Sequence, residues 1–205
     1  MVYVSKQVYI SADYDRFDGD QDVVDELNKW GNDNLHKVDF IDMSKVSSGS
    51  VANDDDCRIC DLKAEFNRQI NASSAVIFVV GDKTGSRTAG SGCERISKEQ
   101  WQCCCTPYKQ NANGTKACKV SSVSIPNENE DFGSINKCSY LRHEFEQAKK
   151  RNKTIIIIYN STRRESSWLP SYMNGYENEA KPFWKIDDNG KKVGDYSYIK
   201  EVLGF

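Results

Sequence analysis

Residues 140–159 of the 205-residue chain read YLRHEFEQAKKRNKTIIIIY. In the first half of this stretch, apolar side chains recur at helical spacing, at Leu141, Phe145 and Ala148. This period predicts a helix from about Cys138 to Arg151. Thr154–Tyr159 shows no alternation of apolar and polar residues, which is typical of a strand covered on both faces. A helix that leads into such a strand indicates a parallel sheet with helices packed against it.

The sequence before this stretch alternates in the same way. Apolar runs predict three further strands, at Gln7–Ser11, Val38–Ile41 and Ala75–Val80. Apolar side chains at helical spacing predict two more helices, one over Gly19–Leu35 and one through Ile59, Leu62, Phe66 and Ile70. The chain closes with an aromatic-rich tail and a short predicted helix near Ile199–Leu203. This order predicts one α/β domain over residues 1–205, with a flavodoxin-like doubly wound parallel sheet.

Residues 85–137 interrupt the alternation. They are rich in Ser, Gly, Asn and Cys, contain two prolines and show little apolar periodicity. A stretch of this length without a clear element is unusual inside a compact domain, so we interpret it as an insertion within the domain. We expect it to lie on the surface beside the functional site, because it joins the end of a strand to the helix beginning near Cys138.

Composition argues against several classes of protein. The formal net charge is −2, which does not suit a protein that coats nucleic acid or binds membranes through a basic surface. No apolar run approaches the roughly 20 residues of a membrane span. The first residues lack the charged and apolar regions of a secretory signal. We therefore expect a cytoplasmic protein without nucleic-acid or membrane partners.

The eight cysteines are interpreted in the light of that compartment. Reduced thiols are the favoured interpretation for cysteines in the cytoplasm. Cys57 and Cys60 have the spacing of one half of a zinc site, and the other half would come from the remaining cysteines. Because no second Cys-x-x-Cys pair is present, we expect no bound metal, and a structural zinc stays the alternative.

The expected strand order places a ligand site at one edge of the sheet. For the order 2-1-3-4, ligands bind beyond the carboxyl ends of the first and third strands, where the order reverses. Three segments then meet, namely Ser11–Arg16, Gly81–Ser86 and the start of the helix near Cys138. The sequence motifs of phosphate loops, redox dinucleotide-binding folds and serine hydrolases are absent.

Glu144 lies inside the apolar stripe of the predicted helix. On a helical wheel it is about 60° from Leu141 and about 40° from Ala148, whereas Glu146 points about 140° away from Leu141. A carboxylate in such a stripe costs several kcal/mol unless it is paired or borders a cavity. Two interpretations stay open: an ion pair, with Arg142 or a basic residue elsewhere, or a functional carboxylate.

Four collinear blocks carry a family resemblance, at Val8–Ser11, Phe40–Asp42, Ile70–Thr84 and Tyr140–Ala148. They resemble the TIR-like domain of the Thoeris antiphage-defence protein ThsB family, over about residues 7–86 and 138–160. The last block is the most specific, because it is similar to the family's Trp-x-x-x-Glu helix with Tyr140 in place of the tryptophan. The insertion interrupts the short link that the family has between its Gly-x-x-Thr turn and this helix.

The resemblance implies a catalytic role for Glu144, at the position where the family carries its catalytic glutamate. It also implies an enzyme of the NAD glycohydrolase or ADP-ribosyl cyclase type, with NAD as substrate and no cofactor. Further residues are expected to bind or shape a site for the substrate: Tyr9, Ser11, Asp13, Tyr14, Asp42, Lys83, Thr84 and Tyr140. Among them, Tyr9 and Tyr14 are candidates for stacking on the base or nicotinamide, and Lys83 and Thr84 for contacting phosphate or ribose.

The function expected from the resemblance is cleavage of the nicotinamide–ribose bond of NAD. The product would be a cyclic or conjugated ADP-ribose messenger in antiphage defence. The expected partners are NAD, an effector protein reached through that messenger, and copies of the chain in a homo-oligomer. A TIR-like adaptor without turnover stays an alternative, as does a transferase that processes free nucleosides.

Overall fold

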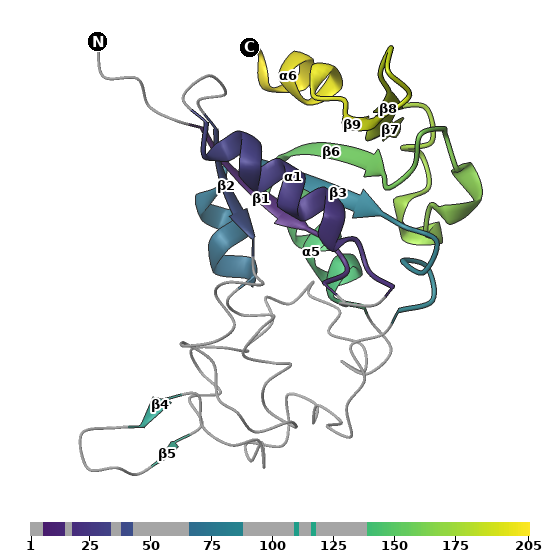
Figure 1. The fold of residues 1–205 in the computed structure, drawn as a ribbon. Coiled ribbons are helices and arrows are strands. Elements are labelled where there is room, and N and C mark those ends of the chain that lie inside the picture. The colour runs from purple at the N-terminus through teal and green to yellow at the C-terminus, as the bar shows by residue number, and fades with distance from the viewer. Residues whose placement is uncertain are drawn as a thin grey trace.

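Five parallel strands form the central sheet, in the order β2-β1-β3-β6-β7 (Figure 1). They are β1 (Lys6–Ser11), β2 (Val38–Asp42), β3 (Ala75–Val80), β6 (Thr154–Tyr159) and β7 (Lys181–Pro182). The computed structural model describes residues 6–14, 18–33, 38–42, 66–87, 109–110, 116–117 and 139–205. The four predicted strands are confirmed, and so is the order 2-1-3-4 on which the expected site depends.

The central strands are strongly apolar because both of their faces are covered. All six residues of β3 are buried, as are the last four residues of β1 and of β6. Ile77 of β3 lies between Ile10 of β1 and Ile156 of β6. β-Branched side chains suit this position, since they pack well on a pleated surface that is buried on both sides.

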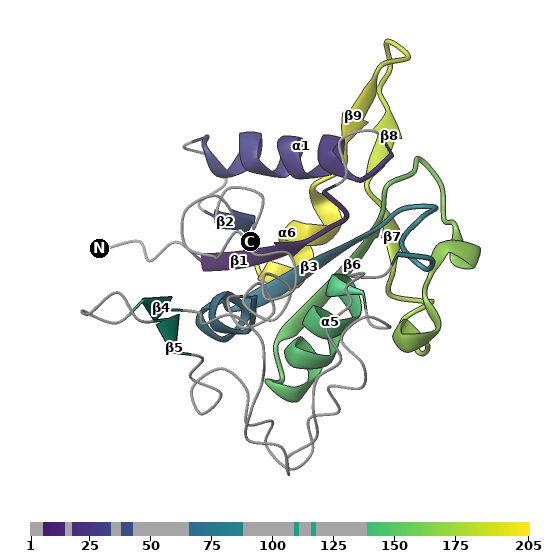
Figure 2. The ribbon, with the colours of Figure 1, turned by 90° about the horizontal axis from the view of Figure 1, so that it is seen from below.

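Helices cover the two faces of the sheet. They are α1 (Gln21–Gly31), α5 (Tyr140–Lys150) and α6 (Ser197–Leu203), together with a helical segment at 66–72. α1 and α6 pack on the face that carries Val8 and Ile10. α5 and the segment at 66–72 pack on the face that carries Tyr9 and Phe78. Figure 2 shows α1 and α5 on opposite sides of the sheet, as expected for an α/β protein.

α5 begins at a serine cap. Ser139 Oγ accepts a hydrogen bond from the backbone N–H of Arg142 at 3.1 Å, which satisfies one donor of the first turn. The helix ends at Lys150, and Asn152 then takes a left-handed conformation with a φ of 50° before the chain enters β6. These bounds lie within the predicted helix, Cys138–Arg151.

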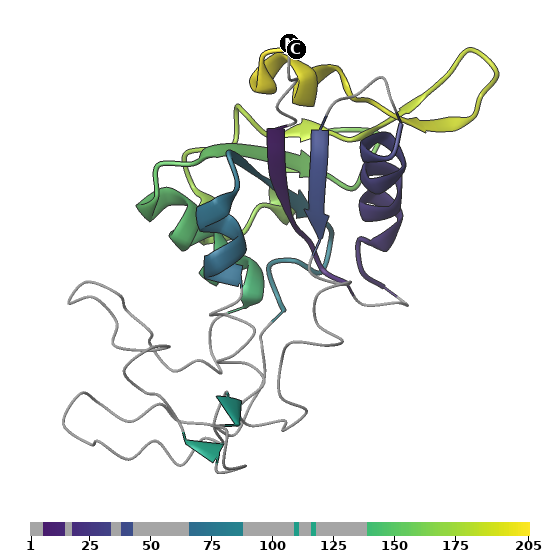
Figure 3. The same cartoon turned by 90° about the vertical axis from the view of Figure 1, so that its left-hand side faces the viewer.

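The tail contains more structure than the sequence predicted. It adds two 3-10 turns, η2 (Ser166–Trp168) and η3 (Ser171–Met173), and the fifth strand β7. An antiparallel hairpin of β8 (Trp184–Ile186) and β9 (Lys192–Gly194) projects beside α1 (Figures 2 and 3). Elements of two or three residues are too short to show a period, so hydrophobic patterning does not find them. α1 covers Gln21–Gly31 of the predicted Gly19–Leu35.

Several expectations lie outside the described residues. Of the predicted insertion at 85–137, the structure describes residues 85–87 and the backbone of one strand pair, β4 (Lys109–Gln110) with β5 (Lys116–Ala117). All eight cysteines, and Ile59 and Leu62 of the second predicted helix, lie outside the described ranges. Within those ranges, no helix has the length and apolarity needed to cross a membrane.

Gly81 follows β3 at a position that leaves no room for a side chain. A Cβ there would lie 2.5 Å from Oδ1 of Asp20, which is itself buried. We expect Gly81→Ala to lower the free energy of unfolding by about 1–3 kcal/mol, the usual cost of overpacking. Chemical denaturation measures this change.

Gly85 provides the matched control in the same turn. A Cβ at Gly85 would meet nothing within 4 Å, so Gly85→Ala should leave the stability unchanged or slightly raise it, because alanine restricts the unfolded chain. Equal effects of the two substitutions would contradict the crowding at Gly81.

Candidate functional site

Glu144 packs against the carboxyl-terminal half of β1, and only 2% of its surface is exposed. Two hydroxyl groups bind its carboxylate, one at each oxygen. Tyr9 Oη donates to Glu144 Oε1 at 2.5 Å, and Ser11 Oγ donates to Glu144 Oε2. Tyr9 and Ser11 are themselves fully buried. The fold therefore joins one helix residue and two strand residues at the edge of the sheet where a ligand is expected.

The periods of the two elements account for this meeting. Side chains on a strand alternate between its faces, so Tyr9 and Ser11 share the face that α5 covers, while Ile10 faces α1. On α5, Glu144 lies in the buried stripe beside Phe145. The prediction that this carboxylate is buried is confirmed, and the strand supplies the polar partners that make its burial tolerable.

Glu146 is an exposed carboxylate on the same helix. Its side chain is 47% exposed and accepts a hydrogen bond from Arg142 Nε at 2.8 Å. Arg142 is the neighbour that the sequence offers as an ion-pair partner for Glu144, and the Nε of its guanidinium is bound to Glu146. An exposed ion pair of this kind contributes about 0.5 kcal/mol or less to the free energy of unfolding. Replacing Glu146 should therefore have little effect, which makes it a matched control for Glu144.

Asp13 and Tyr14 follow β1 and are anchored in different ways. Asp13 Oδ2 accepts a hydrogen bond from Arg87 Nε at 2.5 Å, and the same guanidinium binds Asp18. The hydrogen bond to Asp13, and then that to Asp18, raises the pKa of Arg87. Tyr14 Oη donates to the backbone oxygen of Ile10 at 2.8 Å. Arg87, which the sequence analysis did not single out, thus ties the turn after β3 to the segment after β1.

The turn after β3 contains two further predicted site residues. Thr84 is buried, and its Oγ1 accepts a hydrogen bond from the backbone N–H of Gly81 at 2.8 Å. This bond closes the turn and gives Thr84 a structural role. Lys83 is exposed on the same turn. Its contact with a ligand stays a prediction.

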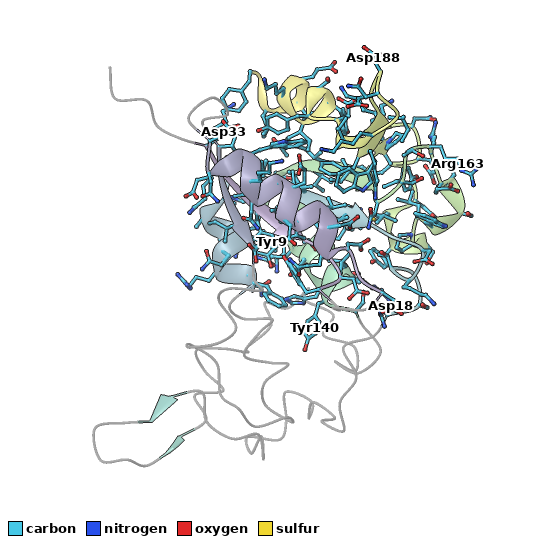
Figure 4. All side chains as sticks on the ribbon, viewed as in Figure 1. Tyr9, Asp18, Asp33, Tyr140, Arg163 and Asp188 are labelled. Carbon is cyan, nitrogen blue, oxygen red and sulfur yellow. The ribbon has the colours of Figure 1, made fainter. Side chains whose placement is uncertain are left out.

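Asp42 and Tyr140 pack against other elements. Asp42 Oδ2 accepts a hydrogen bond from Asn28 Nδ2 of α1 at 2.7 Å, on the face of the sheet opposite Glu144. The ring of Tyr140, which is labelled in Figure 4, packs edge to face on Phe66, and the ring centroids of the pair are 5.4 Å apart. Asp42 is therefore not brought to Glu144, whereas Tyr140 stands one turn before it on the same helix.

Asp20 is a second buried carboxylate, which the sequence analysis did not identify. It directly precedes α1, yet its side chain makes no capping hydrogen bond, and its exposed fraction is 3%. Asn160 Nδ2, just beyond β6, donates to Asp20 Oδ1 at 3.0 Å. Burial raises the pKa of Asp20 to about 6, with smaller contributions from the charges of Asp13 and Asp22. An aspartate before a helix usually indicates a cap, so no sequence signal pointed to this arrangement.

The carboxylate of Glu144, held by Tyr9 and Ser11, can stabilise a positive charge that develops beside it. A buried carboxylate acts more strongly on a developing charge than one in water. Within the described part of the chain, no group of three or more metal-ligating side chains occurs. No family model, no curated protein and no solved structure shows significant similarity to the chain.

Proposed function

We propose that this protein is a TIR-like enzyme that breaks the nicotinamide–ribose bond of NAD. It would release an ADP-ribose-derived messenger for antiphage defence in the cytoplasm. The observation that carries the proposal is the buried carboxylate of Glu144, bound by Tyr9 and Ser11 at the edge where doubly wound sheets bind ligands. The strand order β2-β1-β3-β6-β7 supports a flavodoxin-like topology. The four blocks that resemble the ThsB family support NAD as the substrate.

The chemistry requires no general acid, because the leaving group departs neutral. When the bond between ribose C1′ and the pyridinium nitrogen breaks, its electron pair stays on the nitrogen. The positive charge passes to C1′ and the ribose ring oxygen, as in the transition states of glycoside hydrolysis. Glu144 stabilises that charge. Water, or a hydroxyl or nitrogen nucleophile, then adds to C1′, and a water or hydroxyl nucleophile releases its proton to solvent. NAD is consumed as a substrate, so no cofactor takes part.

Other residues at this edge of the sheet suit the remaining parts of NAD. Lys83 is exposed on the turn after β3 and carries positive charge that suits a diphosphate. Tyr14 and Tyr140 are half-buried, so they are better placed than the fully buried Tyr9 to stack on a base.

A substrate panel tests the proposal. The purified full chain is incubated with NAD and, separately, with free nucleosides, in the presence and absence of an extract from phage-infected cells. We expect nicotinamide release from NAD, measured by liquid chromatography, and an ADP-ribose-derived product, identified by mass spectrometry. Base release from nucleosides with NAD untouched would favour the transferase. No turnover of any substrate would favour the adaptor.

A further inference from the structure

Tyr9 and Ser11 contact the carboxylate of Glu144 from a single strand. We propose that they are positioning residues, which hold this carboxylate in one orientation and do not themselves contact the substrate. The catalytic part of this inference rests on the proposed function. Its structural part rests only on the two hydrogen bonds and on the burial of the three side chains.

The position of Tyr9 excludes its ring from the surface. Tyr9 is fully buried in the core that α5 covers, and β1 lies between β2 and β3 in the sheet. In the parallel register, Tyr9 is flanked by Ile41 of β2 and Val76 of β3. A ring enclosed in this way offers no face on which a base could stack. Its hydroxyl, in contrast, reaches Glu144 Oε1 at 2.5 Å.

The two donors constrain the carboxylate more than either does alone. The last torsion of a glutamate side chain is broad, so the plane of an unrestrained carboxylate turns easily. Here each oxygen of Glu144 is bound by a different hydroxyl, and the two hydroxyls belong to residues two apart on one strand. The backbone of β1 therefore fixes the distance between the donors, and the donors fix the plane of the carboxylate.

A carboxylate that is held in one orientation accelerates the chemical step more than a mobile one does. Dipoles that are already oriented need no reorganisation when charge develops on the substrate. A misplacement of about 1 Å can cost on the order of 10² in rate. Loss of either hydroxyl should therefore slow the chemical step while leaving substrate binding largely intact.

The kinetic test uses Tyr9→Phe and Ser11→Ala, assayed for nicotinamide release from NAD. We expect kcat to fall by about 10-fold to 100-fold in each variant, with KM within about threefold of the wild-type value. Tyr159→Phe is the matched control and should keep the wild-type kcat. Tyr159 is a fully buried tyrosine in the same core, and its hydroxyl lies near Arg164 and Ser166, beyond the end of β6. A raised KM with an unchanged kcat would overturn the inference, because it would mean that the hydroxyls bind substrate.

A second test needs no substrate. Melting temperatures are measured for Tyr9→Phe, Glu144→Gln and the double variant. We expect Tyr9→Phe to lower the melting temperature less when Glu144 is already replaced, because the hydroxyl of Tyr9 then binds a neutral amide, and that hydrogen bond is weaker than one to a charged oxygen. Strictly additive changes in melting temperature would show that Tyr9 and Glu144 do not interact, and this result would overturn the inference. If the shifts are non-additive but the wild type does not turn over NAD, the proposed function fails alone and the positioning of Glu144 stands.

Discussion

Glu144→Gln should lower the rate of nicotinamide release from NAD by about 10³-fold or more while leaving the protein folded. Glutamine keeps the shape of the side chain, so the core between α5 and β1 stays filled. The substitution removes the negative charge that the oxocarbenium-like transition state requires. The free energy of unfolding should stay unchanged or rise slightly, because removing the desolvation cost of the buried carboxylate offsets the loss of one of its two hydroxyl hydrogen bonds. Single-turnover kinetics and thermal melting of the purified variant measure the two effects.

Glu146→Gln is the control for this prediction. It makes the same chemical change two residues further along α5, on a side chain that is 47% exposed and paired with Arg142. Its effects on the rate and on the melting temperature should both be small. If Glu144→Gln unfolds the protein, or releases nicotinamide as fast as wild type, then Glu144 has a structural role and the adaptor becomes the better hypothesis.

Asp20→Asn should stabilise the protein at neutral pH and have little effect near pH 4. The pKa of Asp20 is raised from 3.8 to about 6, so the folded protein binds a proton between these values that the unfolded chain does not. The wild type therefore loses stability as the pH rises through this window. At pH 7.5 the substitution should remove a penalty of about 3 kcal/mol, since each unit of pKa corresponds to about 1.4 kcal/mol.

Denaturation of wild type and Asp20→Asn at pH 4 and pH 7.5 measures this effect. The hydrogen bond from Asn160 is retained, because an amide oxygen accepts it as a carboxylate does. Asp25→Asn, on the exposed surface of the same helix, should change stability by less than about 0.5 kcal/mol at either pH. A stabilisation by Asp20→Asn that is equal at the two pH values would show that the burial of charge is not its cause.

The sequence predicts the sheet well because its central strands are buried on both faces. β3 and β6 were predicted with their observed bounds, since a run of apolar, mostly β-branched residues has few alternatives in a protein of this class. The burial of Glu144 was predicted for a similar reason, because helical period alone places a residue on a stripe. Such properties depend on local patterns.

The partners of the buried groups depend on contacts between distant segments. Tyr9 and Ser11 were predicted to line the site, but the sequence gives no sign that they bind Glu144, which lies more than 130 residues away. The hydrogen bond between Asp20 and Asn160 spans 140 residues and is equally invisible to a local pattern. Hydrophobic period places a side chain on a face, whereas a hydrogen bond also depends on the register of strands and the position of helices.

The side chains on the two faces of β1 have different roles. Val8 and Ile10 enter the core under α1, while Tyr9 and Ser11 hold the carboxylate under α5. Selection for a well-folded protein and selection for a particular reaction therefore act on alternate positions of the same six residues. A substitution at Tyr9 or Ser11 therefore acts on the orientation of Glu144, whereas a substitution at Val8 or Ile10 acts on the packing under α1.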